Sequence, residues 1–228
     1  MRDTPFINRE HYHIYNRGTD KRVVFQDEED FRRFLQGIDE FNVADPIGSL
    51  YENFYKKKKN KLKNLQEDKL VNIIAYCLNP NHYHFILEQV ADKGIEKFMQ
   101  RLGNGYTKYF NNKNNRSGVL FQGRFKSRHV NTNEYLLHLS AYVNLNDQVH
   151  QLRHPMSKLV GSNIVKWSSW NEYTDRKKDA NNNICNIKII TEQFNGRREY
   201  KMFASSSLKS IRNKRDAEKE FDELVIEG

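Results

Sequence analysis

Two apolar segments joined by a tight turn constrain the fold more than any other part of the chain. The first, residues 71–78, is almost continuously apolar, which is typical of a strand at the centre of a sheet. The second, residues 82–89, follows directly after the turn Asn79-Pro80-Asn81. Because so short a connection joins antiparallel neighbours, the sequence predicts a central antiparallel hairpin.

The segments around this hairpin extend it to a complete small domain. Residues 11–18 are rich in aromatic and β-branched side chains and end in a turn signal, so they predict a strand. Residues 27–41 begin with four acidic side chains and continue with apolar residues at helical spacing, so they predict a helix. After the hairpin, residues 93–112 predict a second helix, and a basic segment ends in a strand near residue 130.

A third helix is expected over residues 133–146. Either Asn131 or Thr132 caps it, and Asn131 with Glu134 resembles a capping box. The resulting order, β-α-β-β-α-β-α, predicts an α+β fold: a ferredoxin-like antiparallel sheet with helices on one face.

The sequence divides into one domain and an appendage. Residues 8–150 form the expected domain, with a lysine-rich insert near 48–70. Residues 151–228 form a C-terminal extension that is partly docked and partly helical or flexible. Its Trp-Ser-Ser-Trp patch at 167–170 is the expected docking point, and helices are expected at 192–208 and 210–225.

Composition narrows the function classes. Lys and Arg number 38 against 29 Asp and Glu, a net charge of +9, which favours a polyanionic partner such as nucleic acid. There is no apolar run of the ~20 residues that a membrane span needs, and the first residues do not resemble a signal peptide. The two cysteines lie far apart, which indicates neither a disulfide framework nor a zinc finger. We therefore expect a cytoplasmic protein without a membrane partner.

Two histidines on the second hairpin strand are candidate metal ligands. His82 and His84 alternate along the strand and so project from one face, where both imidazoles can bind a single divalent ion. The pattern is weak by itself, because His11 and His13 repeat it. For either pair the alternative is ordinary strand histidines held by hydrogen bonds.

The helix over 133–146 carries a candidate nucleophile. Tyr142 and Asn146 lie one turn apart on the same helix face. A tyrosine hydroxyl, with a pKa near 10, attacks a phosphodiester only when a metal polarises the phosphate, and a carboxamide oxygen can complete such a metal site. The alternative is that Tyr142 is a core aromatic of an amphipathic helix.

Together, four ordered motifs resemble the single-tyrosine HUH (His-hydrophobic-His) transposases, and more narrowly the REP-associated tyrosine transposase branch. The motifs are residues 15–18, 76–87, 120–127 and 135–146, and the Trp-Ser-Ser-Trp patch resembles another feature of the branch. The resemblance implies an enzyme that cuts and rejoins single-stranded DNA, often beside a hairpin, through a 5′-phosphotyrosine. It implies Tyr142 as nucleophile, His82, His84 and Asn146 as ligands of Mg²⁺ or Mn²⁺, no nucleotide cofactor, and a homodimer associated with the nucleoid when acting.

The DNA-binding surface is expected from charge and stacking. Candidate contacts to the DNA are Arg17, Arg116, Arg124, Lys126, Arg128 and Phe121. For Phe121, a place in the core is the alternative. A second function also stays open: a domesticated relative that binds hairpin nucleic acid without cutting it. Asn146-Asp147 departs from the Asn-Pro that often follows the catalytic tyrosine in the family.

Overall fold

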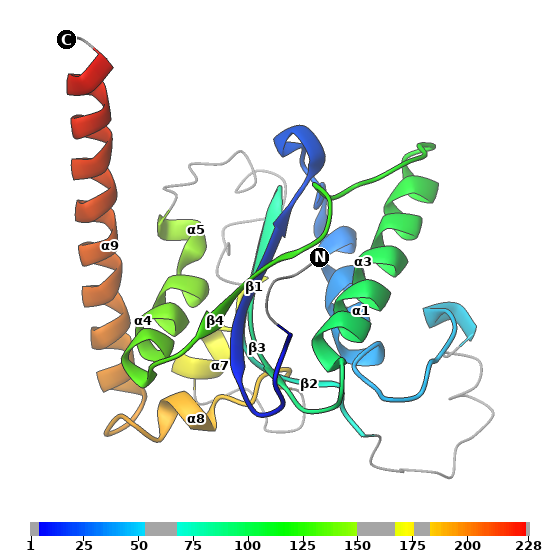
Figure 1. Ribbon diagram of the computed structural model, residues 1–228, viewed down its shortest axis with the longest axis horizontal. Helices are drawn as coiled ribbons and strands as arrows, with labels where there is room; N and C mark the ends of the chain where they lie inside the picture. Colours follow the sequence, from blue (N-terminus) through cyan, green and yellow to red (C-terminus); the bar gives the residue numbers. More distant parts are fainter. Residues whose placement is uncertain (1–4, 53–67, 150–166, 176–182, 227–228) are drawn as a thin grey trace.

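The computed structural model describes residues 5–52, 68–149, 167–175 and 183–226 (Figure 1). Within them, a four-stranded antiparallel sheet has the order β2-β3-β1-β4. Its strands are β1 (His11–Arg17), β2 (Val71–Asn79), β3 (His82–Gln89) and β4 (Lys126–Val130). The helices α1 (Glu28–Glu40) and α3 (Gly94–Lys113) connect β1 to β2 and β3 to β4. This order and these two crossovers make the fold α+β and ferredoxin-like, as predicted.

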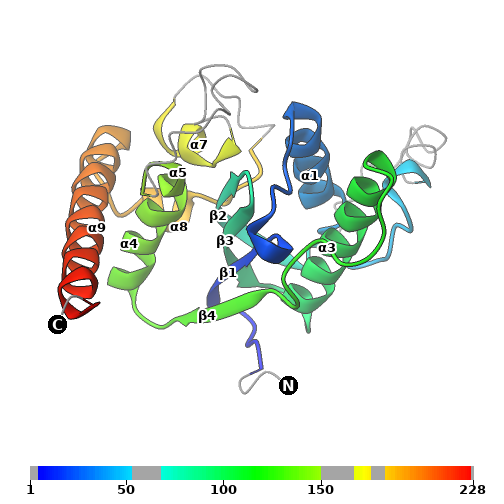
Figure 2. The same cartoon turned by 90° about the horizontal axis from the view of Figure 1, so that it is seen from above.

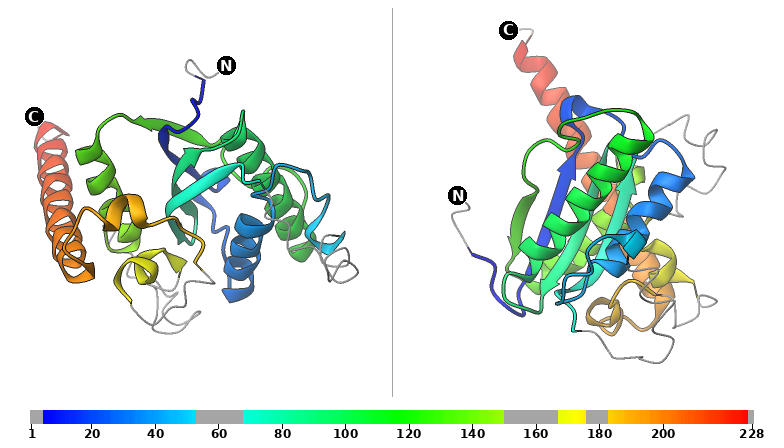
Figure 3. Two further views of the ribbon diagram at one scale, coloured as in Figure 1. Left: turned by 90° about the horizontal axis from the view of Figure 1, so that it is seen from below. Right: turned by 90° about the vertical axis from the view of Figure 1, so that its right-hand side faces the viewer.

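One face of the sheet packs against α1 and α3, which lie side by side across the strands (Figure 3, right). The core on this side is largely aromatic, and the rings of Phe34, Tyr83 and Phe85 meet within it. Because side chains alternate along a strand, the residues that flank Tyr83 point to the other face. This alternation sends His82 and His84 away from the aromatic core.

The other face is also covered, by α4 (Asn133–Asn144) and by α9 (Arg197–Ile226), which lies outside α4 (Figure 2). The sequence led us to expect helices on one face, and the second helical layer is an addition to that expectation. Its physical reason lies in the central strands, which are apolar on both sides: Ile74, Cys77 and Ile86 are buried beneath α4 and α9. A two-sided apolar strand needs cover on both faces.

The ends of α4 differ from the predicted ones. Thr132 caps the helix, because its side-chain oxygen accepts from the Tyr135 backbone N–H at 3.1 Å. The predicted capping box of Asn131 with Glu134 is therefore wrong. The helix ends at Asn144, and after Leu145 a separate short helix, α5 (Asn146–Val149), begins.

The C-terminal extension packs along the β2 edge and over α4 (Figure 3, left). Trp167 stacks on Phe31 at 4.6 Å between ring centroids, and Ser169 N–H donates to the Tyr76 carbonyl oxygen at 3.0 Å. The extension continues through α7 (Trp170–Thr174) and α8 (Lys188–Thr191) to α9. The two helices predicted over 192–225 are one, because no glycine or proline interrupts residues 197–226.

The lysine run at 56–63 lies outside the described residues. Among the described helices, none combines the length and the apolar character that a membrane crossing requires.

Candidate functional site

His82 and His84 face α4 from the central strand β3. Their rings lie 5.2 Å apart between centroids and are perpendicular to each other. The tight turn at Pro80-Asn81 sets Asn79 of β2 directly opposite His82, and on the other side β1 sets Tyr15 opposite His84. The hairpin that constrains the fold thus also fixes the place of both imidazoles.

Three asparagine side chains surround His82. Its Nδ1 lies 2.6 Å from Asn81 Oδ1, and its Nε2 lies 3.2 Å from Asn146 Oδ1 and 2.9 Å from Asn79 Nδ2. Burial lowers the pKa of His82, against the raising effect of its hydrogen bond with Asn146, and nearby Arg17 lowers it further. A neutral imidazole with its proton on Nδ1, donated to Asn81, accepts at Nε2 from Asn79 Nδ2.

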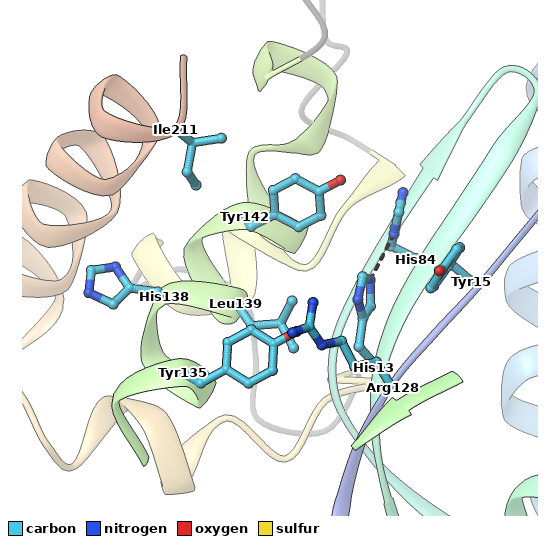
Figure 4. A pocket seen from close by; sticks show the side chains of 9 residues that line it. All are labelled: His13, Tyr15, His84, Arg128, Tyr135, His138, Leu139, Tyr142 and Ile211. Carbon is cyan, nitrogen blue, oxygen red and sulfur yellow. Dashed lines mark hydrogen bonds between the residues drawn. The ribbon is translucent and has the colours of Figure 1, made fainter. Parts of the chain in front are cut away.

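His84 is paired with a residue that the sequence did not single out. His84 Nδ1 lies 2.9 Å from His13 Nε2, and both side chains are buried (Figure 4). Burial and the charge of Arg128 lower the pKa of His13 to about 4, so His13 is neutral near pH 7. When His84 donates from Nδ1 to His13, its proton is on Nδ1, which is the tautomer in which Nε2 can act as a metal ligand.

The sequence alone does not show which of His11 and His13 lies near His84. Both belong to the same His-x-His pattern, but only the strand register shows which of them is near His84. His13 lies opposite Ile86, two residues from His84 on the same face, whereas His11 lies opposite Glu88 at the far end of the strand.

Tyr142 projects from α4 toward His13 and His84, into a pocket of about 500 Å³ (Figure 4). The Tyr142 ring meets His84 edge-on at 5.6 Å and His13 edge-on at 6.1 Å between centroids. The pocket is lined by His13, Tyr15, His84, Arg128, Tyr135, His138, Leu139, Tyr142 and Ile211. Tyr142 is only partly buried, so it borders a space that a ligand can enter rather than filling the core.

Asn146 lies just past the end of α4 and is completely buried. Its Oδ1 accepts from Asn79 Nδ2 at 2.7 Å, while its own Nδ2 has no hydrogen-bond partner in the described part of the chain. The break between α4 and α5 therefore does not remove Asn146 from the site. The structure brings Asn146 to His82, and Tyr142 to His84.

The donor set fits a divalent cation. Two imidazole nitrogens and a carboxamide oxygen are acceptable ligands for Mn²⁺ and, less ideally, for Mg²⁺. The 3.2 Å between His82 Nε2 and Asn146 Oδ1 is close to the spacing of about 3.0 Å between adjacent ligands in an octahedral shell with bonds of 2.0–2.1 Å. Within the described ranges no three His, Cys, Asp or Glu side chains cluster as a metal site, so the candidate ligands are two imidazoles and an amide oxygen.

Several predicted DNA contacts border the pocket. Lys126 and Arg128 lie on the exposed edge strand β4, on the face that carries the pocket, and the Arg128 guanidinium lies 5.4 Å from the Tyr135 ring centroid. Arg124 is exposed just before that strand. Arg17 is exposed at the end of β1, where its Nε donates to Gln122.

Two other predicted contacts have structural partners instead. Arg116 donates to Asn111 Oδ1 and to the Val119 carbonyl oxygen, so it ties the loop to the end of α3. The structure places Phe121 in the core at 8% exposure, with its ring 5.5 Å from Tyr83 and 6.3 Å from Tyr106. That position does not fit stacking on a DNA base, and the core alternative is the one observed.

Among known proteins, one family matches the segment that contains these residues. Residues 48–146 match the family described as "Transposase IS200 like", and this segment contains His82, His84, Tyr142 and Asn146. The match covers less than half of the chain, and it agrees with the resemblance drawn from the sequence. No curated protein matches the chain.

A similar solved structure is described as "Structure of the REP associates tyrosine transposase bound to a REP hairpin". It shares 14% sequence identity with this chain, and the match covers 77% of this chain and 86% of that one at a TM-score of 0.48.

Proposed function

We propose that this protein is a metal-dependent transposase that cuts and rejoins single-stranded DNA through a 5′-phosphotyrosine at Tyr142. The observation that carries the proposal is the meeting of α4 with β3. There Tyr142 faces His84 across the pocket, and Asn146 is in contact with His82. A tyrosine that only filled the core would not border an open pocket together with the two buried histidines His13 and His84.

The chemistry follows from the placement of these groups. The Tyr142 oxygen attacks the scissile phosphorus, the bond to the 3′ oxygen breaks, and the phenol proton leaves while the 3′ oxygen takes one up. Mg²⁺ or Mn²⁺ held by His82, His84 and Asn146 would polarise the phosphate and stabilise the developing charge. Attack by a 3′-hydroxyl on the phosphotyrosine reverses the step, so rejoining needs no nucleotide cofactor.

The exposed basic side chains around the pocket support binding of a DNA strand. Lys126 and Arg128 lie on the pocket side of β4, and Arg124 and Arg17 both lie near the first residue of that strand. These cations would hold phosphates, while the partly buried Tyr135 offers a ring on which a base can stack. The family resemblance favours sites flanked by hairpins, a homodimer, and action at the nucleoid in the cytoplasm.

A test is the formation of a covalent protein–DNA adduct. The full chain is incubated with single strands from the DNA flanking its gene and with Mn²⁺, with and without chelator, and resolved on a denaturing gel. We expect an adduct that disappears with chelator. Tight hairpin binding without an adduct would contradict the proposal and favour the alternative, a hairpin-binding protein that does not cut.

A further inference from the structure

The side chain of Asn79 bridges His82 and Asn146, which are two of the proposed metal ligands. Asn79 is the last residue of β2 and is 2% exposed. Its Nδ2 lies 2.9 Å from His82 Nε2 and donates to Asn146 Oδ1 at 2.7 Å. No part of the family resemblance assigns a role to this residue.

The hairpin explains why Asn79 is there. Asn79 and His82 are directly paired across the two-residue turn, so their side chains leave the same face of the sheet. Asn146 then reaches the pair from the beginning of α5. Three side chains from three different elements thus converge on one buried point.

The three atoms form a triangle of the size that a metal shell requires. Its sides are 2.7 Å between Asn79 and Asn146, 2.9 Å between Asn79 and His82, and 3.2 Å between His82 and Asn146. Three adjacent ligands of an octahedral ion with bonds of 2.0–2.1 Å are separated by about 3.0 Å. The positions of the three side-chain atoms therefore already match one face of an octahedral shell.

One of the three atoms, Asn79 Nδ2, is a hydrogen-bond donor and cannot bind a metal ion. A rotation of the Asn79 amide replaces it with Oδ1, which can. Without a cation, the Asn79 NH₂ group faces two acceptors, while its Oδ1 lies 3.8 Å from Cys77 Sγ. Turning the amide by half a turn puts Oδ1 at the corner and the NH₂ toward the thiol sulfur, which is a weak acceptor. The rotation gives up the two hydrogen bonds of the Asn79 NH₂ group and a weak contact to sulfur, and a bond from Oδ1 to the ion replaces them.

We propose that Asn79 is a further metal ligand, whose amide turns its oxygen to the ion when His82, His84 and Asn146 bind it. This inference rests on the proposed function for the presence of the ion. It deepens that function, because a second amide oxygen makes the two-histidine site harder and better suited to Mg²⁺.

The test is the affinity of the full chain for Mn²⁺ in the absence of DNA, measured from the EPR signal of free Mn²⁺. Asn79→Asp keeps an oxygen at the corner and adds charge, so we expect tighter binding, by about tenfold. Asn79→Leu has a similar volume and no donor atom, so we expect roughly 10–100-fold weaker binding. His82→Ala establishes that the measured ion is the one at this site.

The aspartate variant separates a ligand from a hydrogen-bond donor. If Asn79 only donates to His82 and Asn146, Asn79→Asp breaks both contacts and weakens Mn²⁺ binding as Asn79→Leu does, which overturns the proposal. Asn81→Asp is the matched control, because it places the same charge behind the His82 imidazole at Nδ1. An equal gain from both aspartates would show a general charge effect and would also overturn it.

A measurement on the unaltered chain covers the case in which a buried aspartate disturbs folding. In a crystal of the wild-type protein grown with Mn²⁺, the anomalous peak should lie about 2.1 Å from the Asn79 amide oxygen. A peak bound by His82 and His84 with Asn79 beyond ~3.5 Å would refute Asn79 as a ligand. It would leave the DNA-cleaving function intact, since that function is judged by the covalent adduct.

Discussion

The hydroxyl of Tyr200 is predicted to stabilise the helix that carries the nucleophile. Tyr200 of α9 is completely buried, and its hydroxyl accepts from Asn144 Nδ2 at 2.8 Å and shares a hydrogen bond with Ser140 Oγ at 3.1 Å. Asn144 in turn accepts from Ser169 Oγ, which links α9, α4 and the β2 edge in one buried network. Asn144 is two residues from Tyr142 and two from Asn146, so this network holds the end of α4 that carries the site.

Tyr200→Phe removes the hydroxyl and nothing else. Ser140 keeps its bond to the Leu137 carbonyl oxygen, but Asn144 Nδ2 loses its acceptor. One buried donor left unpaired costs about 1–3 kcal/mol of unfolding free energy, or roughly 2–12 °C in melting temperature for a chain of this size. Urea unfolding followed by circular dichroism measures the loss.

A matched control comes from the same helix. Tyr135→Phe removes a hydroxyl from a partly exposed side chain of α4, and we expect a change within about 0.5 kcal/mol. If Tyr200→Phe unfolds at the same urea concentration as the wild type and Tyr135→Phe, the network does not stabilise α4, and the reasoning is refuted.

The remaining predictions concern packing, metal binding and DNA. In α3, Gly94→Ala should be strongly destabilising in thermal unfolding, because its Cβ would lie 2.1 Å from the Leu70 carbonyl oxygen. Gly103→Ala, whose Cβ would meet nothing within 4 Å, should stabilise the protein by about 1 kcal/mol. If Gly94→Ala were the more stable of the two variants, the packing of α3 described here would be contradicted. Calorimetric titration should show His13→Ala weakening Mn²⁺ binding roughly 10–100-fold through the loss of its contact with His84, and His11→Ala far less; equal effects would exclude a positioning role for His13. Affinity for single-stranded DNA should fall steeply with salt, with a log–log slope of about −0.7 per phosphate contacted, and a flat response would exclude phosphate binding.

The strands and helices that have a periodic pattern of apolar residues could be predicted from the sequence. Alternation through residues 82–89 and helical spacing through residues 27–41 and 93–112 each report a local period, and the structure has these elements within one or two residues. The second helical layer was not predicted, although the two-sided apolar character of Val71–Leu78 already indicates that both faces need cover. What the sequence lacked was the partner, because α9 contacts α4 from more than 50 residues away.

For the candidate site too, the sequence indicated the residues that a local pattern marks and missed those that depend on contacts between distant segments. The strand and helix periods, with the family resemblance, identified His82, His84, Tyr142 and Asn146. They did not identify His13 or Asn79, because both reach the site through cross-strand pairing, which depends on register rather than on spacing. The prediction of Phe121 as a DNA contact rested on the composition of its segment, which is basic and aromatic as a binding surface is. Composition does not show which ring faces the core, and Phe121 does.

The most direct test of the central claim is to map the covalent DNA link on the protein. The wild-type chain and Tyr142→Phe are each incubated with the same single strand and Mn²⁺, and the adduct is digested and analysed by mass spectrometry. We expect a nucleotide attached to Tyr142 in the wild type, and no adduct in Tyr142→Phe although DNA binding is retained. An adduct that persists in Tyr142→Phe, or that maps to another tyrosine, would contradict the assignment of Tyr142 as the nucleophile.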